Sequence, residues 1–308
     1  MEVRVFAPAT VSNIGPGFDV LGLALAAPGD TVTARLDPAG PSAVRITTIR
    51  GDDGELPTDA RRNTAGVAAQ ATLARIGLEG AVELEIDKGL PIGSGLGSSA
   101  ASAAAAAFAV NELAGAPLTT LELVEFCVEA EEAVSGCHAD NVAPALLGGL
   151  ILVRGADPAD VVHVPVPADL FIACTTPAIS LSTRRARAVL PEQVPLQAMV
   201  RNGANLAALV SACHSGDVDL LGTCITDDIV APARAELIPG SLDAMEAANA
   251  SGAIGASISG GGPTVMALCR AAEAADRASA AMASAFEAVG LSSRSFVSPA
   301  GCPGARTT

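Results

Sequence analysis

Residues 90–108 combine closely spaced glycines with serines at the start of an alanine-rich segment. Three glycines alternate with other residues across 93–97, and Ser98 and Ser99 follow directly. Glycines let backbone amides approach a ligand closely, and a helix N-terminus carries unpaired N–H donors with partial positive charge. We expect the two serine hydroxyls to cap the helix that follows. The stretch therefore predicts either a site for an anion such as phosphate or a flexible, well-capped turn.

The stretch differs from two familiar nucleotide-binding loops. In G-x-x-x-x-G-K-[ST] a lysine reaches the outer phosphates, whereas Leu96, Gly97 and Ser98 stand where that lysine would be. A dinucleotide loop, G-x-G-x-x-G, has a different glycine spacing and needs an acidic residue at the end of a second strand. The alanine-rich helix occupies that later region here. Phosphate binding would therefore depend on glycine amides, serine hydroxyls and the helix N-terminus.

A second glycine-rich segment, SNIGPGFDVLG, lies near the start of the chain at 12–22. Its glycines and Pro16 are typical of a turn. Asn13 and Asp19 add an amide and a carboxylate, which could accept hydrogen bonds from an ammonium or hydroxyl group. The segment is either a plain turn or a loop that binds a substrate.

Acidic residues and a histidine gather between 129 and 141. Carboxylates near phosphates often hold Mg²⁺, which prefers oxygen ligands, but a glutamate cluster is as often a solvated helix face. We expect the histidine and its two polar neighbours in a loop after a helix. The residues concerned are Glu129, Glu131, Glu132, His138, Asp140 and Asn141.

The second half of the chain contributes arginines and a triple-glycine turn. A guanidinium fork matches a carboxylate with two hydrogen bonds, although a single arginine is more often a surface charge. ISGGGPTVMAL (258–268) is either a tight hairpin or a close backbone approach to a ligand. The basic residues of STRRARAVLP and APARAELIPG are Arg184, Arg185, Arg187 and Arg234, with Thr183 beside them.

The surrounding pattern places these motifs between strands and helices. Apolar alternation predicts a strand at 81–90 that leads into the glycine-rich stretch, and further strands at 2–9, 30–36, 43–49, 160–166, 169–176, 255–259 and 264–269. Helical spacing predicts helices at 63–76, from Thr119 or Thr120 to Val134, and at 196–215, 217–229, 241–252 and 271–289. We expect the tail after Pro303 to be frayed.

Composition bounds the class of protein. With 308 residues, half of them hydrophobic, and a composition shift near residue 155, the chain favours two domains. Aromatic residues make up 2%, which argues against base-stacking surfaces. The net charge of −15 would repel a nucleic-acid backbone, so we expect no nucleic-acid partner. Lys88 is the single lysine, and we assign it no role.

The cysteines and the start of the chain indicate a compartment. Seven cysteines, at 127, 137, 174, 213, 224, 269 and 302, show no C-x-x-C spacing, so we expect free, mostly buried thiols and no zinc site. The first residues lack a signal-peptide pattern, and no apolar run reaches about 18 residues. We expect a soluble, cytoplasmic protein without a membrane partner.

Three segments taken together resemble one kinase superfamily. PATVSNIGPGFD (8–19), PIGSGLGSSAAS (91–102) and SGGGPT (259–264) are similar, in that order, to the motifs of the galactokinase, homoserine kinase, mevalonate kinase and phosphomevalonate kinase (GHMP) superfamily. Each motif is weak alone, but their order over nearly the whole chain is specific. Within the superfamily, HADNVAPALLGG (138–149), STRRARAVLP and DDIVAPARAELIPG (227–240) resemble the homoserine kinase family.

The resemblance implies an α+β fold with two domains. The N-terminal ATP-binding domain, at 1–155, would be a mixed α/β domain with a left-handed βαβ unit, and a ferredoxin-like domain at 156–308 would contribute substrate-binding residues. The implied activity is transfer of the γ-phosphoryl group of ATP to the side-chain hydroxyl of L-homoserine, giving O-phospho-L-homoserine for threonine biosynthesis. ATP and Mg²⁺ are the implied cofactors, and a homodimer is left open.

The resemblance also implies roles for individual residues. ATP would be bound by Pro91, Ile92, Gly93, Ser94, Gly95, Leu96, Gly97, Ser98, Ser99, Ala100 and Ala101, and Mg²⁺ by Ser98 and Glu131. Counting back from Gly136 favours Glu131 over Glu129 and Glu132. Asp19, His138 and Asn141 would surround the homoserine ammonium group, and Arg187 and Arg234 would pair with its carboxylate. Asn13 and Thr183 would lie near the attacking hydroxyl, with Asp140 as a candidate base.

Two departures and three alternatives belong to this prediction. SGGGP replaces the usual glycine-serine-glycine form, and the segment between Gly136 and His138 is one residue shorter than in some relatives.

The alternatives are another small-molecule kinase of the superfamily, a nucleotide-binding regulator without activity, and an NAD-binding dehydrogenase. The paired arginines argue against a regulator, because a pure sensor needs no clamp for a substrate acid group.

Overall fold

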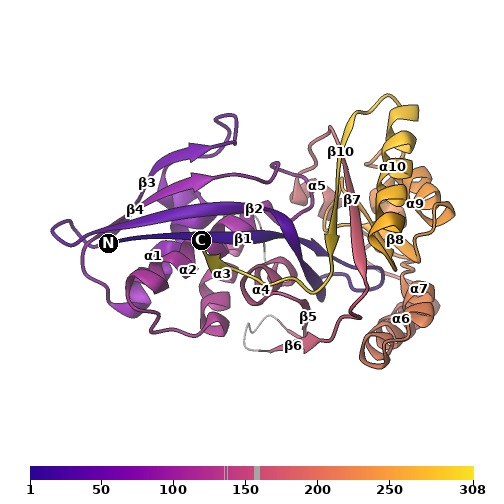
Figure 1. The fold of residues 1–308 in the computed structure, drawn as a ribbon, viewed down its shortest axis with the longest axis horizontal. Helices are drawn as coiled ribbons and strands as arrows, with labels where there is room; N and C mark the ends of the chain where they lie inside the picture. The colour runs from indigo at the N-terminus through magenta and orange to yellow at the C-terminus, as the bar shows by residue number, and fades with distance from the viewer. Residues whose placement is uncertain (135, 137, 156–159) are drawn as a thin grey trace.

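Two β-sheets organise the chain in the computed structural model, which describes residues 1–134, 136, 138–155 and 160–308 (Figure 1). Within these residues the first sheet has seven strands, with the central order β11-β1-β2-β4-β3, and β5 and β6 continue from β2. The strands are β1 (Glu2–Ser12), β2 (Leu21–Asp37), β3 (Ala43–Arg50), β4 (Ala81–Asp87), β5 (Leu150–Val153), β6 (Val161–Val164) and β11 (Arg306–Thr307).

Strand β2 is longer than its apolar alternation predicts. It pairs with β1 in two runs, which begin at Glu2 opposite Arg35 and end at Ser12 opposite Gly22, and the register shifts between Pro8 and Thr10. The added segment, 21–25, is buried on both faces of the sheet. A strand covered on both faces has no polar alternation, so sequence periodicity could not reveal it.

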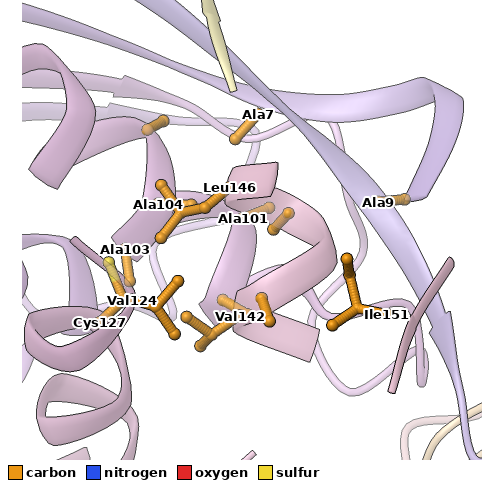
Figure 2. Packing of buried hydrophobic residues seen from close by; sticks show 14 of the residues in the cluster. Ala7, Ala9, Ala101, Ala103, Ala104, Val124, Cys127, Val142, Leu146 and Ile151 are labelled. Carbon is orange, nitrogen blue, oxygen red and sulfur yellow. The ribbon is translucent and has the colours of Figure 1, made fainter. Parts of the chain in front are cut away.

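Four helices cover one face of this sheet: α1 (Thr64–Ile76), α2 (Ser98–Leu113), α3 (Thr120–Val134) and α4 (Ala139–Leu147) (Figure 1). Helix α1 lies within one residue of its predicted bounds: the Asn63 side chain accepts from Ala65 N, and Gly77 ends the helix at φ 70°. Helix α2 is central, and its alanines are fully buried. Figure 2 shows Ala101, Ala103 and Ala104 packed among side chains of α3, α4 and β1. Small side chains therefore let three helices and a sheet approach one another closely.

The second sheet has the order β10-β7-β9-β8, and all of its pairs are antiparallel. Its strands are β7 (Phe171–Pro177), β8 (Gly255–Ile258), β9 (Val265–Cys269) and β10 (Ser293–Pro299), packed on α9 (Ser241–Ala250) and α10 (Ala272–Ala288). This order is that of a ferredoxin-like β-α-β-β-α-β unit. Four further helices lie between β7 and β8, namely α5 (Thr183–Ala188), α6 (Leu196–Ser215), α7 (Val218–Cys224) and α8 (Val230–Ala235).

The two-domain α+β fold is confirmed. Strands β3 and β4 are parallel and joined through α1, as expected for the βαβ unit, whose hand stays a prediction. The domain limits at 155 and 156 also stay a prediction, and residues 156–159 lie outside the described residues. The expected frayed C-terminus is wrong, because β11 pairs with β1 and Thr308 N donates to Arg4 O at 3.0 Å.

Six cysteines are buried free thiols, as expected, and Cys137 lies outside the described residues. Burial raises the pKa of the Cys127 and Cys174 thiols, and raises the pKa of Cys269 to about 11.

Among the helices described, we find none with the length and apolar character needed to cross a membrane.

Candidate active site

A cavity of about 610 Å³ lies where segments from both sheets meet. Its walls include the glycine loop (residues 91–97), the segment 12–19, helix α5 and the triple-glycine turn (residues 259–264). The predicted residues that line it are Asn13, Asp19, Ile92, Gly93, Ser94, Gly95, Gly97, Ser98, Ser99, Glu131, His138, Asp140, Asn141, Thr183, Arg187 and Arg234. The fold thus brings together three motifs that are far apart in sequence.

The triple-glycine turn holds the glycine loop in place. The carbonyl of Ser94 accepts from Thr264 Oγ1 at 2.7 Å, and the carbonyl of Gly95 accepts from Ser259 Oγ at 2.7 Å. Gly95 has φ +77°, and a Cβ there would stand 2.5 Å from Ser259 O and 2.6 Å from Gly262 O. The turn therefore makes its close backbone approach to another loop of the protein, and Gly95 makes that contact sterically feasible.

The hydrogen-bond donors of the glycine loop suit an anion. Its carbonyls are turned toward protein donors, and in the described part of the chain the N–H groups of 93–97 have no hydrogen-bond acceptor. The Ser94 hydroxyl is buried and has no partner among the same residues. Buried donors without partners are costly, so a ligand with several acceptor oxygens fits this loop.

The serines after the loop do not cap α2, which corrects the expectation from sequence. Gly97, at φ 66°, is the N-cap residue and makes no side-chain cap hydrogen bond. Ser98 Oγ instead donates to Leu90 O at 3.3 Å, and Ser99 Oγ donates to Glu131 Oε2 at 3.1 Å. The first N–H groups of α2 keep their positive end toward the cavity, which favours an anion there.

Of the three glutamates at 129, 131 and 132, Glu131 reaches the cavity. Its side chain is 1% exposed, whereas Glu129 and Glu132 are exposed and do not line the cavity. Glu131 Oε2 lies 3.1 Å from His138 Nδ1. Burial disfavours the imidazolium, but the hydrogen bond and charge of Glu131 outweigh it and raise the pKa of His138.

The oxygen donors around Glu131 fit magnesium. Among the described residues no group of three His, Cys, Asp or Glu side chains could hold a metal by itself. Mg²⁺ does not need such a group, because it commonly binds one or two carboxylates together with substrate phosphates and water. A buried carboxylate beside serine hydroxyls and a loop suited to an anion is that kind of donor set.

Asp140 and Asn141 lie in the first turn of α4, where the sequence predicted a loop. Asp140 is 2% exposed, and burial, reinforced by the charge of Asp19, raises the pKa of its carboxyl to about 6. Asn141 Nδ2 donates to Ser12 Oγ at 3.0 Å, and its Oδ1 accepts from Thr10 Oγ1 at 2.9 Å. These bonds fix the start of α4 against β1.

Asn13 and Asp19 are held in left-handed backbone conformations, at φ 60° and 58°. Asn13 Oδ1 accepts from Asp19 N at 2.8 Å, and Asn13 Nδ2 donates to Gly260 O at 2.9 Å. The amide of Asn13 therefore links its own loop to the triple-glycine turn. Strained residues of this kind are often found at functional sites.

The two predicted carboxylate-binding arginines, Arg187 and Arg234, both line the cavity. Arg187 pairs with both oxygens of Asp19, at 2.9 and 3.0 Å. Arg234 is 3% exposed and donates to Gly260 O at 2.6 Å, and its burial lowers the pKa of its guanidinium. Both guanidinium groups stack on Phe18, at 5.5 Å for Arg187 and 5.2 Å for Arg234.

Some predicted residues do not line this cavity, and some lining residues were missed. Leu96, Ala100 and Ala101 bury their side chains in the core, and Pro91 borders a neighbouring cavity. Lys88 lines the active-site cavity although we assigned it no role; its position directly before the glycine loop was the available signal. Leu56, Pro57, Arg62 and Asn63 also line it, with no signal in the sequence.

Comparison with known proteins shows the family of the chain. The model of the GHMP kinases N-terminal domain matches residues 63–149, and that of the GHMP kinases C-terminal domain matches residues 209–288. A homoserine kinase of Chlorobium phaeobacteroides is 44% identical over 96% of both chains. One from Arabidopsis thaliana is 45% identical over 94% of this chain and 80% of its own length.

A solved structure gives the same result in three dimensions. The crystal structure of homoserine kinase from Cytophaga hutchinsonii has a TM-score of 0.96 and 44% sequence identity, and the match covers 100% of this chain and 97% of the other. Sequence and fold therefore agree along the whole length of this chain. The chain belongs to the homoserine kinase family of the GHMP kinases.

Proposed function

We propose that this protein transfers the γ-phosphoryl group of ATP to the side-chain hydroxyl of L-homoserine, forming O-phospho-L-homoserine and ADP for threonine biosynthesis. One observation carries the proposal beyond family membership. A single cavity holds a glycine loop suited to phosphates together with Asp19, Arg187 and Arg234, which are suited to the two charged ends of an amino acid.

The glycine loop and the start of α2 would bind the ATP phosphates. The N–H groups of 93–97 and the Ser94 hydroxyl, which have no acceptor among the described residues, supply donors without a lysine in the loop. Ser98 and Glu131 would hold Mg²⁺, which supplies charge neutralisation to the phosphates. The hydrogen bond from Ser99 to Glu131 supports this assignment, because it orients the carboxylate toward the loop.

The amino-acid substrate would bind at the opposite wall. Its carboxylate would pair with Arg187 and Arg234, since a guanidinium matches a carboxylate with two parallel hydrogen bonds. Asp19, His138 and Asn141 would surround its ammonium group. The bidentate Asp19–Arg187 pair supports this arrangement, because each member would be matched by one charged end of a zwitterion.

Phosphoryl transfer depends mainly on alignment and neutralisation of charge. Asn13 and Thr183 would orient the attacking hydroxyl, and Asp140 is our candidate to accept its proton. The hydroxyl oxygen forms a bond to the γ-phosphorus as the bond to the β-phosphate oxygen breaks. The pKa of about 6 for Asp140 leaves much of this carboxyl ionised at neutral pH, which suits a general base.

We also propose that the chain divides into domains at 1–155 and 156–308. We propose further that the protein acts in the cytoplasm. Six buried free thiols support a reducing compartment. Its partners in this proposal are small molecules, ATP and L-homoserine, with no nucleic acid.

An assay of ADP release tests the proposal directly. Purified protein with Mg²⁺ and ATP should release ADP much faster with L-homoserine than with L-threonine, mevalonate or galactose, and a reaction without acceptor gives the background. Mass spectrometry should find one phosphoryl group on homoserine. Faster turnover with another acceptor would refute the substrate, and binding of ATP without turnover would refute catalysis.

A further inference from the structure

The single lysine of the chain is buried directly behind the glycine loop. The Lys88 side chain is 2% exposed, and it forms an ion pair with Asp30, whose side chain is fully buried. Lys88 follows β4, and Asp30 lies 58 residues earlier on β2. Lysine and aspartate are rarely this buried without a specific partner, so the pair is a built feature of the site.

All three hydrogens of the Lys88 ammonium group are used within the protein. One bonds Asp30 Oδ2, one bonds Ser98 O at 2.9 Å, and one bonds Ser102 Oγ at 2.8 Å. An ammonium group has three donors. In this arrangement Lys88 therefore has no donor left for a phosphate, although its side chain borders the cavity.

Asp30 holds the other end of the loop. Its Oδ1 accepts from Gly89 N at 3.0 Å and from Leu90 N at 3.2 Å, and its Oδ2 accepts from Ser102 Oγ at 2.6 Å. Leu90 O in turn accepts from Ser98 Oγ. The residues before and after the glycine loop are thus fixed to one buried cluster, which we call the Lys88 cluster (Asp30, Lys88, Ser98 and Ser102).

We propose that Lys88 is a positioning residue for ATP binding: together with Asp30 and Ser102 it holds both ends of the glycine loop so that the N–H groups of the loop converge on the phosphates. The proposal rests on the proposed function only in taking ATP as the ligand. The ion pair has no net charge, so its effect is on geometry. Small displacements of such groups weaken binding and catalysis strongly.

Ser102→Ala is the mildest test, because it removes one hydroxyl and leaves the ion pair intact. Titration calorimetry with Mg²⁺ and ATP should show a Kd about 3- to 10-fold higher, as expected for about 1 kcal/mol. Ser279→Ala is the matched control, since it removes a buried serine hydroxyl from α10 in the other sheet's layer. A Kd within twofold of wild type for Ser102→Ala would overturn the proposal.

A pair of variants separates positioning from direct phosphate contact. Lys88→Met leaves Asp30 buried without its cation, so we expect a loss of at least 30-fold in ATP affinity or a failure to fold. Adding Asp30→Asn removes that unpaired charge and keeps an acceptor for Gly89 N and Leu90 N. The double variant should bind ATP about 3- to 30-fold more weakly than wild type. The neutral pair avoids the cost of a lone buried charge, but it lacks the hydrogen bonds from Lys88 to Ser98 O and Ser102 Oγ that hold the loop.

A loss of more than about 30-fold in the double variant would refute the proposal and assign the lysine charge a direct role on the phosphates. An affinity within about threefold of wild type would also refute it, because the loop would then not need Lys88. The measurement does not need turnover of homoserine. If wild type binds ATP but phosphorylates another acceptor, the proposed substrate fails and this test still stands. If wild type binds no ATP, both fail together.

Discussion

Asp19 and Arg187 form a bidentate ion pair across the mouth of the cavity, at 2.9 and 3.0 Å, although 168 residues separate them in sequence. The pair brings together the residue proposed to bind an ammonium group and one proposed to bind a carboxylate. Both side chains are partly exposed, so their mutual attraction contributes little to stability. An amino acid can therefore replace the pair with two new ion pairs at small cost.

Arg187→Ala should raise the KM for homoserine by roughly 10- to 100-fold, the usual cost of losing one bidentate ion pair. We expect kcat and the KM for ATP to change less than about threefold, because the phosphate side of the cavity is untouched. Steady-state kinetics with each substrate varied in turn measures this. Arg185→Ala is the control, since Arg185 is an exposed arginine of the same helix outside the cavity. An unchanged homoserine KM would remove Arg187 from the substrate site.

Phe18 should affect the KM for homoserine without contacting the substrate. Its ring stacks on the guanidinium groups of Arg187 and Arg234, and cation–π contacts of this kind are worth about 0.5–1 kcal/mol each. Phe18→Leu should raise the homoserine KM about 3- to 10-fold and leave the ATP KM unchanged. Phe6→Leu is the control, because Phe6 makes the same type of contact with Arg306 at 4.6 Å on a different part of the sheet. Equal effects of the two variants would contradict a role specific to the site.

Gly95→Ala should disrupt the glycine loop. The added methyl group would stand 2.5 Å from Ser259 O and 2.6 Å from Gly262 O, so the loop or the triple-glycine turn must move. We expect at least a 30-fold loss of ATP affinity and a destabilisation of about 2 kcal/mol. Gly115→Ala has a similar φ of +82° but meets no atom within 4 Å, so it isolates the backbone strain from the clash. If Gly115→Ala lowers ATP affinity as much, the clash is not the cause.

Local signals predicted most helices and strands well. Helix α1 carries a capping asparagine and a terminal glycine, and β7, β8 and β9 alternate or form short apolar runs, whereas β10 was not predicted. The failures have physical causes. The first part of β2 is buried on both faces, α4 is short and contains Pro144, and β11 forms because β1 offers an open edge. None of these tertiary effects can be read from a window of sequence.

In the candidate site too, some features follow from local sequence and others depend on tertiary contacts. From its own residues the glycine loop could be either an anion site or a well-capped turn, and only resemblance to a family favoured the first and named its partners. Lys88 was missed because its meaning depends on Asp30, 58 residues away. The serine caps were wrong because Glu131 and Leu90 O compete for the two hydroxyls. Long-range contacts decide what each polar side chain does.

Asp140→Asn should stabilise the protein at high pH. Burial, and then the charge of Asp19, raise the pKa of Asp140 to about 6 from 3.8, while His138 and the Ser12 hydroxyl favour its charged form. The folded state therefore binds its proton more tightly than the unfolded state, and wild-type stability falls as pH rises from about 4 to about 6. This difference in pKa between the folded and unfolded states corresponds to roughly 3 kcal/mol in the free energy of unfolding.

Urea unfolding of both proteins at several pH values measures this. The amide that Asp140→Asn introduces carries no charge, so the variant should be more stable than wild type by up to about 3 kcal/mol at pH 8, and the gap should close below pH 4. The same variant should lose most of its kcat at pH 8 if Asp140 accepts the proton of the substrate. If the difference in unfolding free energy between the two proteins is independent of pH, burial does not penalise the charge of the Asp140 carboxylate. A stabilised variant with full kcat would leave Asp140 a buried acid without a part in proton transfer.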